Sequence, residues 1–410
     1  MHGFHDVFIQ ILVLLAISVT VIGIAKLIKE PYSIALVLVG VLLGMTQIPM
    51  VEEAEQFITQ SEVFHAIIIS LFLPILLGDA TLKMPFHHLY DLKKTVISLA
   101  FLGTFLTFIV IGFSTYFILG LPIVVSFTFA ALMSATDPIS VLSIFKGLGV
   151  PQKYSTIMEG ESLFNDGIAV VLFKISSIYL LGYMEMGLAG VGEGAFLFLK
   201  FAVGGALVGL IFGYVFSQII RIFDDYPLEI AFSMLLFFGS YFVAEHFKVS
   251  GVIAVVVAGL LFGSYGKKIG MSEETRVNIN SFWDTVTLLA NSLIFLMVGI
   301  EIREIDFSGK WGMILIAIVI FLVGRTIALF ISTSYVKDLT NKDRILLNWG
   351  GLRGSLSIAL ALSLPDDFDG REEVLLLTFS IVLFSLVVQG LSLKPLIKKL
   401  GIVGPGSKES

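Results

Sequence analysis

The chain has 410 residues, of which 57% are hydrophobic and only 14% are charged, and its mean hydropathy is +0.97. Because soluble domains are about 45–50% apolar and about 25% charged, this composition excludes an ordinary soluble protein and predicts a membrane protein. The net charge of −6 argues against a nucleic-acid partner, which requires a strongly basic surface. Cysteine is absent, which excludes disulfide bonds and thiolate metal or redox sites.

Apolar runs bounded by charged or Gly/Pro-rich turns follow one another along the whole chain. A bilayer core of about 30 Å needs about 20 apolar residues per helix, and thirteen runs meet or approach that length. We therefore expect an all-α membrane protein with about 13 transmembrane helices, forming one domain over residues 1–400 with a short cytoplasmic tail at 401–410. The runs lie near 6–28, 31–46, 61–79, 94–118, 121–148, 153–181, 191–222, 226–247, 250–266, 275–302, 309–336, 343–364 and 371–398.

The basic residues are sorted between alternate loops. Most of the 26 Lys and Arg lie in one set of loops, whereas the other set holds only Lys248, Arg303, Lys310 and Arg371. Loops rich in positive charge are retained on the cytoplasmic side. We therefore predict a multi-pass protein of the cell membrane with its N-terminus outside and its C-terminus in the cytoplasm.

The fifth run contains the sequence Ser134-Ala-Thr136-Asp137-Pro138. Proline has no amide hydrogen and disfavours helix at the residue before it, so we expect the helix to be interrupted here. An interrupted backbone within a membrane is tolerated only where it lines a cavity or is buried in protein. The freed carbonyls, the Thr136 hydroxyl and the Asp137 carboxylate are hard oxygen ligands, which small alkali cations prefer.

The sixth run carries Ser162, Asn165 and Asp166 on one face of the expected helix. At 1.5 Å per residue, Asp166 lies roughly 20 Å from the cytoplasmic end of its run and Asp137 about 24 Å from the outer end of its own. The two aspartates thus reach similar depths, and we predict that they form an ion site. A buried structural pair is the alternative interpretation.

Further charged residues need partners or water. Glu161 in the sixth run and Arg325 in the eleventh lie at compatible depths, and since neither could stay charged alone, we expect them to pair. Asp79 ends the third run and is expected to be a polar support or a cytoplasmic-entrance residue rather than an ion ligand. Asp284 in the tenth run is expected to face water or lipid headgroups.

The twelfth run contains Gly350-Gly-Leu-Arg353-Gly354, in which three glycines weaken the helix around a buried arginine. The fifth and twelfth runs hold the same place in two sets of six runs. Interrupted segments at matching positions indicate the substrate site of an inverted-repeat transporter. The expected divisions are repeat one at about 6–181, a linking helix at about 191–222 and repeat two at about 226–398.

Short motifs occur along the chain in an order and spacing that are together highly specific. They are Phe72-Leu-Pro-Ile-Leu-Leu-Gly-Asp79, Ala135-Thr136-Asp137-Pro138, Glu159-Gly-Glu161-Ser162-Leu-Phe-Asn165-Asp166, Ser250-Gly-Val-Ile-Ala-Val-Val-Val-Ala-Gly259, Phe282-Trp-Asp-Thr, Gly324-Arg325 and Gly350-Gly-Leu-Arg353-Gly. In these motifs the chain resembles the cation/proton antiporter family that includes prokaryotic NhaP-type sodium/proton antiporters and animal sodium/proton exchangers. The resemblance covers the whole membrane domain.

This resemblance implies a fold with two inverted repeats, crossed discontinuous fifth and twelfth helices, and a separate region that forms a homodimer. It also implies a role for each residue around the first interruption. Asp166 would bind the transported Na+ and the proton alternately. Thr136 and Ser162 would ligate the cation, and Asp137 would support the site directly or through water.

The other polar residues would have supporting roles by the same resemblance. The Asn165-Asp166 pair is the family's mark of electroneutral exchange, and Asn165 would steady the crossed helices. Glu161 would pair with Arg325, and Arg353 would offset charge near the second interruption. Prokaryotic members often have a glutamate after a bulky residue where this chain has Gly78-Asp79, so the family's pattern assigns Asp79 no role.

The expected function is exchange of sodium, or lithium, for protons by alternating access, with a role in pH homeostasis. The substrates are Na+ and H+, with Li+ or K+ also possible on the ligand set, and the chain needs a lipid bilayer but no cofactor and is not an enzyme. A potassium/proton antiporter is the alternative, because K+ also accepts oxygen ligands. An intramembrane aspartyl protease is a remote alternative, since no aspartate here follows a Gly-x-Gly sequence.

Overall fold

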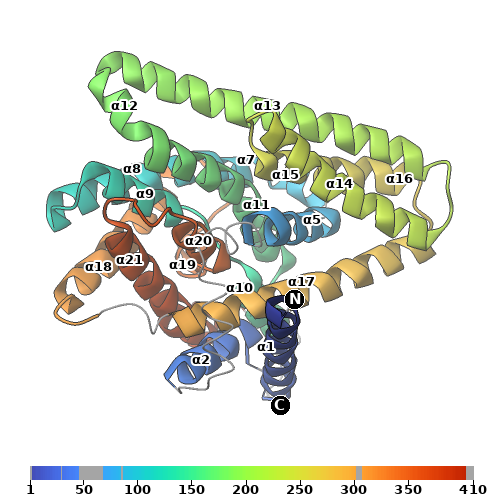
Figure 1. Ribbon diagram of the computed structural model, residues 1–410, viewed down its shortest axis with the longest axis horizontal. Coiled ribbons are helices and arrows are strands. Elements are labelled where there is room, and N and C mark those ends of the chain that lie inside the picture. Colours follow the sequence, from blue (N-terminus) through green and yellow to red (C-terminus); the bar gives the residue numbers. More distant parts are fainter. Residues whose placement is uncertain (1, 29, 46–67, 85, 302–306, 403–410) are drawn as a thin grey trace.

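The computed structural model describes residues 2–28, 30–45, 68–84, 86–301 and 307–402, and the regular secondary structure in these ranges is helical (Figure 1). The N-terminal helices, with η marking π-helical segments, are α1 (His2–Leu27), α2 (Tyr32–Met45), η1 (Ile68–Phe72), α5 (Leu73–Lys83), α6 (Phe86–Asp91), α7 (Lys93–Ile97), η2 (Ser98–Gly103), α8 (Thr104–Ser114) and η3 (Thr115–Leu119). The central helices are α9 (Ile123–Leu132), α10 (Ile139–Leu148), α11 (Gln152–Lys174), η4 (Ile175–Tyr179), α12 (Leu180–Glu185), α13 (Leu188–Ile220) and α14 (Tyr226–His246). The C-terminal helices are α15 (Gly251–Leu261), η5 (Phe262–Gly266), α16 (Lys267–Ile269), α17 (Glu273–Glu301), α18 (Trp311–Ser332), α19 (Asn341–Trp349), α20 (Ser355–Leu362), α21 (Arg371–Phe384), η7 (Ser385–Gln389) and α22 (Gly390–Leu400).

The helices follow the predicted apolar runs. Within the described ranges, eight helical segments are each long and apolar enough to cross a membrane, judged by length and composition. Shorter apolar helices fill the first, second and fifth runs. The all-α membrane fold class is confirmed, whereas the count of 13 spans stays a prediction. The start of the third run, 61–67, and the tail at 403–410 lie outside the described residues.

The fifth and twelfth runs are each divided into two helices, as the sequence predicts. Residues 133–138 separate α9 from α10, and residues 350–354 separate α19 from α20. In Figure 1, α10, α19 and α20 lie nearer the middle of the molecule, and α9 lies beside α8. The amide of Asp137 donates a hydrogen bond to the carbonyl of Leu352 at 2.8 Å, so the two interruptions meet through their main chains. The predicted fold class requires the two interruptions to meet in this way.

Glycines allow two pairs of helices to approach closely. On α13, Gly205, Gly209 and Gly213 recur every fourth residue and face the backbone of α15, where a Cβ atom would collide with carbonyl oxygens. Gly40 of α2 and Gly299 of α17 face each other, and an added Cβ on either would lie 2.7–2.8 Å from the other's Cα. Small residues at such contacts are typical of membrane helices, which associate through close packing rather than hydrophobic exclusion of water.

Helix α11 lies inside this bundle and places the polar face that the sequence singles out. It packs against α9, α15 and α20, and most of its residues from Tyr154 to Phe173 are buried. A helix enclosed on all sides must satisfy its polar side chains within the protein. The polar face of α11 therefore has to meet the interrupted segments.

Candidate functional site

The first interruption follows from proline and is stabilised by hydroxyl groups. Pro138 cannot donate an amide hydrogen, so α9 ends at Leu132 and a new helix begins at Ile139. The Ser134 hydroxyl donates to the carbonyl of Ala131 at 2.6 Å, and the Ser357 hydroxyl of α20 donates to that of Leu132 at 2.8 Å. The second interrupted helix thus satisfies a carbonyl that the end of α9 leaves free.

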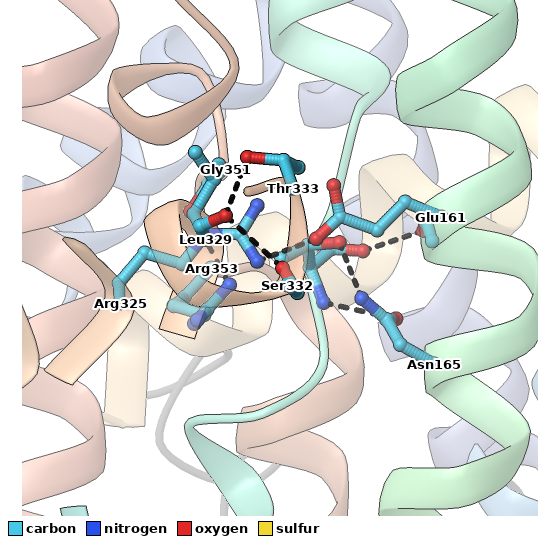
Figure 2. Close-up of polar contacts among 10 residues, drawn as sticks. Glu161, Asn165, Arg325, Leu329, Ser332, Thr333, Gly351 and Arg353 are labelled. Atoms are coloured by element: carbon cyan, nitrogen blue, oxygen red, sulfur yellow. Dashed lines mark hydrogen bonds and ion pairs between the residues drawn. The ribbon is translucent and has the colours of Figure 1, made fainter. Parts of the chain in front are cut away.

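Three side chains of this region form a hydrogen-bonded group between α11 and the first interruption. Ser162 donates its hydroxyl hydrogen to the carbonyl of Thr136 at 2.5 Å. The amide of Asn165 donates to the Thr136 hydroxyl at 2.8 Å and accepts from the Thr136 backbone N–H at 3.3 Å. Figure 2 shows Asn165 extending from α11 toward the non-helical segment of the first interruption. Thr136 is therefore held on its backbone and on its side chain.

Asp137 and Asp166 line the same cavity, which has a volume of about 410 Å³. Oδ1 of Asp137 accepts the amide of Ile139 at 3.0 Å, and its other oxygen lies against Gly354. Oδ1 of Asp166 is buried and has no hydrogen-bond partner among the described residues. Thr136 and Ser162 line the cavity too, whereas Asn165, fully buried, is not among its lining residues. The arrangement gathers carboxylate and hydroxyl oxygens around one cavity.

Positive charge is concentrated near the second interruption. Arg325 of α18 forms an ion pair with Glu161 at 2.5 Å, and the two side chains are only 4% and 2% exposed. Arg353 is completely buried, and its guanidinium lies over the ring of Phe321 with 5.0 Å to the centroid. Figure 2 shows both arginines on one side of the crossing, opposite the acidic and amide side chains of α11. Nη1 of Arg353 donates a hydrogen bond to the carbonyl of Gly351 at 3.3 Å.

Two glycines of the twelfth run make room for charged side chains. A Cβ atom on Gly351 would lie 2.8 Å from Nη2 of Arg325, and one on Gly354 would collide with the carboxylate of Asp137. The sequence predicts a weakened helix from these glycines but gives no sign of these contacts. They are close-approach positions as well as helix breakers.

Asp79 lines the same cavity. It forms an ion pair with Lys83, one turn later on α5, and Lys83 also contacts Asp284 of α17 at 2.6 Å. Asp284 therefore has a protein partner as well as exposure to solvent. Among the described residues, no group of three or more His, Asp or Glu side chains is placed to hold a resident metal ion.

Residues 13–399 match the family profile described as "Sodium/hydrogen exchanger, transmembrane". The chain belongs to this family. The sodium/hydrogen exchangers are a transporter family, and this membership confirms the resemblance drawn from the motifs.

Individual members of the sodium/hydrogen exchanger family align over nearly the whole chain. The Na(+)/H(+) antiporter NhaH of Halobacillus aidingensis is 77% identical over 402 residues, covering 98% of this chain and all of the relative. The Na(+)/H(+) antiporter NhaG of Bacillus atrophaeus is 54% identical, covering 97% of this chain and 76% of the relative. The solved structure of the sodium proton antiporter MjNhaP1 from Methanocaldococcus jannaschii superposes with a TM-score of 0.78 at 23% identity, covering 98% of this chain and 99% of that one. The last comparison shows a shared fold.

Some cavity residues of this exchanger-family chain were not predicted from the sequence. Lys83, Glu159, Thr287 and Asn291 line the cavity together with the predicted aspartates. Lys83 and Glu159 have a local signal, since Lys83 follows Asp79 by four residues and Glu159 precedes Ser162 by three, and such pairs share a helix face. The α17 residues come from a helix more than 100 positions away in sequence, and nothing in their spacing indicates which helix they face.

Proposed function

We propose that the protein exchanges sodium ions for protons across the membrane, one cation for one proton. The observation that carries this proposal is the shared cavity of Asp137 and Asp166, built from an interrupted helix and from α11. Membership of the sodium/hydrogen exchanger family supports it, as do relatives named Na(+)/H(+) antiporters.

Asp166 is the proposed exchange residue. Its buried Oδ1 lacks a hydrogen-bond partner among the described residues and is therefore free to accept a cation or a proton. Sodium would be held by Asp166, Thr136, Ser162 and Asp137, whose oxygens are hard ligands suited to a small cation. A proton on Asp166 removes the charge that holds sodium, so the two substrates exclude each other. If access changes only when Asp166 is neutralised by either substrate, exchange is obligatory.

The surrounding residues hold this site in place. Asn165 steadies Thr136 through two hydrogen bonds, and the Glu161–Arg325 pair joins α11 to α18. Arg353 supplies positive charge beside the crossing and offsets the aspartates. Asp79 is proposed as a residue of the cavity entrance, because it lies on the cavity wall and is ion-paired with Lys83.

Sodium is the proposed cation because the relatives are named for it, and lithium is proposed as a second substrate of similar size. Potassium/proton exchange is not favoured by those names. We also propose that the chain has no catalytic activity of its own, in keeping with a transporter family and unlike a protease.

The membrane arrangement is proposed as follows. The charge of the loops supports an N-terminus outside and a C-terminus in the cytoplasm of a plasma-membrane protein. The two interrupted helices support repeat one at about 6–181, a linking helix at about 191–222 and repeat two at about 226–398. A homodimer rests on the family resemblance, and light scattering of the purified protein in detergent tests it.

Asp166→Asn tests the role of this residue directly. The variant should fold but lose sodium-dependent proton movement in everted membrane vesicles, because its amide can neither take up a proton nor balance a cation. Asp367→Asn, which changes an exposed carboxylate in the 363–370 loop, is the matched control and should retain exchange. Exchange by Asp166→Asn at the wild-type rate would contradict the proposal.

Competition and stoichiometry are separately measurable. Lowering the pH on the cation side should raise the apparent KM for sodium and leave the maximal rate at saturating sodium nearly unchanged, because proton and cation use one carboxylate. Collapsing the membrane potential should leave the rate of one-for-one exchange unaltered. A rate that follows the potential would contradict electroneutral exchange.

A further inference from the structure

The cavity has a mouth formed by three charged side chains. Lys83 ends α5, and its ammonium group is ion-paired with Asp79 of the same helix and lies 2.6 Å from Oδ1 of Asp284 on α17. All three residues line the cavity that contains Asp137 and Asp166. The ammonium group of Lys83 thus lies between the carboxylates of Asp79 and Asp284, on the route to the exchange site.

The exposure of these side chains gives their order along the route. The side chain of Asp284 is 68% exposed, that of Lys83 is 32% exposed and that of Asp79 is 12% exposed. Asp284 is therefore at the rim, Asp79 lies deeper, and the ammonium group lies between them. A cation that enters from solvent passes Lys83 before it reaches the inner carboxylates.

The cavity wall two turns further along α17 offers an unused oxygen ligand. Asn291 of α17 lies two turns after Asp284 and also lines the cavity. Asn291 is only 1% exposed, and its Oδ1 has no hydrogen-bond partner among the described residues. The two carboxylates make a suitable environment for a monovalent cation, and the ammonium of Lys83 lies between them.

We propose that Lys83 is a tethered cation that competes with entering sodium at the mouth of the cavity and so sets the apparent affinity for it. The ammonium neutralises Asp79 and repels other cations, so its removal leaves two uncompensated carboxylates facing the route. Lys83 does not touch the transported ion in the exchange site, and it is an affinity-determining residue rather than a ligand. This inference rests on the proposed exchange function.

The test is a split between KM and maximal rate. Lys83→Met keeps the length of the side chain but removes its charge, and it should lower the KM for sodium by roughly threefold to tenfold, the range for a partly exposed charge contact. The maximal rate per folded protein should change little. Lys83→Arg should restore the wild-type KM, and Asp284→Asn should raise it because one attractive charge is lost. These KM values and maximal rates are measured as proton flux in everted vesicles. Sodium is added outside the vesicles, which is the cytoplasmic side where Asp79 is expected to form the entrance.

The matched control is Lys93→Met. Lys93 is an exposed lysine of α7 that lies 3.6 Å from the ring centroid of Tyr90 and is not part of the cavity wall. This substitution removes the same charge and should leave the KM for sodium unchanged. An equal fall in KM in both lysine variants would mean that only the general surface charge matters, and it would overturn the inference.

A binding measurement separates this inference from the proposed function. Purified wild-type and variant proteins in detergent are heated with increasing NaCl, and with choline chloride as the ionic-strength control. Lys83→Met should reach half of the sodium-specific rise in Tm at a concentration roughly threefold to tenfold lower. If wild-type protein shows this binding but no exchange, the proposed function fails and the role of Lys83 stands. If wild-type protein exchanges ions while Lys83→Met has unchanged KM and binding, the inference is wrong and the function stands. If Lys83→Met does not accumulate, an unchanged KM in Asp284→Asn overturns the inference.

Discussion

The two interruptions both break a helix inside the bundle, but the charged side chains beside them have opposite sign. The first, at residues 133–138, presents Thr136 and Asp137 to an open cavity. The second, at residues 350–354, is packed against the buried guanidinium groups of Arg325 and Arg353. One proline produces the first interruption, whereas the second depends on glycines that leave space for neighbouring side chains.

This difference shows how a membrane protein can keep carboxylates at depth. Buried carboxylates repel each other and are costly to desolvate, and nearby fixed positive charge reduces both effects. Gly354 of the second interruption lines the cavity, but Arg325 and Arg353 do not, so these arginines need not compete for the transported cation. We therefore expect substitutions at the second interruption to affect mainly stability, and substitutions at the first to affect mainly ion affinity.

The largest expected effect comes from the ion pair beside the second interruption. Glu161→Gln leaves Arg325 buried without its counter-charge, and breaking such a pair costs about 3–5 kcal/mol. Denaturant unfolding in detergent measures this loss, with the exposed Glu372→Gln as control. The double variant Glu161→Gln, Arg325→Met should recover part of it, because no unpaired charge remains. A single variant as stable as wild type would show that the pair contributes nothing.

A second substitution tests the contact between the two interruptions. An alanine at position 354 would collide with the side chain of Asp137, and overpacking of this kind costs about 1–3 kcal/mol. Gly354→Ala should also raise the KM for sodium, since Asp137 has to move. Gly147→Ala in α10 is the control, because no atom lies within 4 Å of the added Cβ and alanine favours helix. If the two variants had the same free energy of unfolding and the same KM for sodium, the close contact of Gly354 with Asp137 would not be needed.

A third substitution tests the side-chain amide of Asn165, which holds Thr136 in the first interruption. Asn165→Ala removes both hydrogen bonds to Thr136, and at about 0.6 kcal/mol for a typical bond between membrane helices the loss is about 1 kcal/mol. Exchange should fall more than this small loss suggests, because Thr136 is a proposed ligand. Asn278→Ala is the control, because the half-buried amide of Asn278 donates only to the carbonyl of Glu274 one turn earlier on the same helix, and this variant should leave exchange unchanged. Wild-type exchange in Asn165→Ala would mean that Thr136 needs no support.

The smallest effect compares two serine hydroxyls that each make one hydrogen bond to the first interrupted helix. Ser357→Ala removes the bond to Leu132, and Ser162→Ala removes the bond to Thr136, so each variant should lose about 0.6 kcal/mol. Only Ser162→Ala should raise the KM for sodium, because only Ser162 is a proposed ligand. Equal KM values in the two variants would place Ser162 among purely structural residues.

Features that depend on local chemistry were predictable from the sequence. Pro138 indicates the first interruption, and the glycines around Arg353 indicate the second, since both act on the backbone that carries them. The helix periodicity also places Ser162, Asn165 and Asp166 on one face of α11, and the depth estimate brings Asp166 to the level of Asp137. The structure places these last two residues on one cavity.

Contacts between distant helices were not predictable in the same way. Asp284 contacts Lys83 across 201 positions of sequence, and helical periodicity says only which residues share a face, not which helix that face meets. Likewise, the space that Gly351 leaves for Arg325 depends on how α18 lies against the second interruption. Such contacts are set by the packing of the whole bundle, for which a single sequence contains no direct signal.

The hydrogen bond from Asp137 to Leu352 joins two peptide groups rather than two side chains. Replacement of Leu352 by any residue keeps its carbonyl, and at position 137 only proline lacks the donor. Almost all point mutations at either end therefore keep both groups that make this hydrogen bond. The link between the two interruptions is encoded in the main chain, whereas the ligands around it are encoded in side chains.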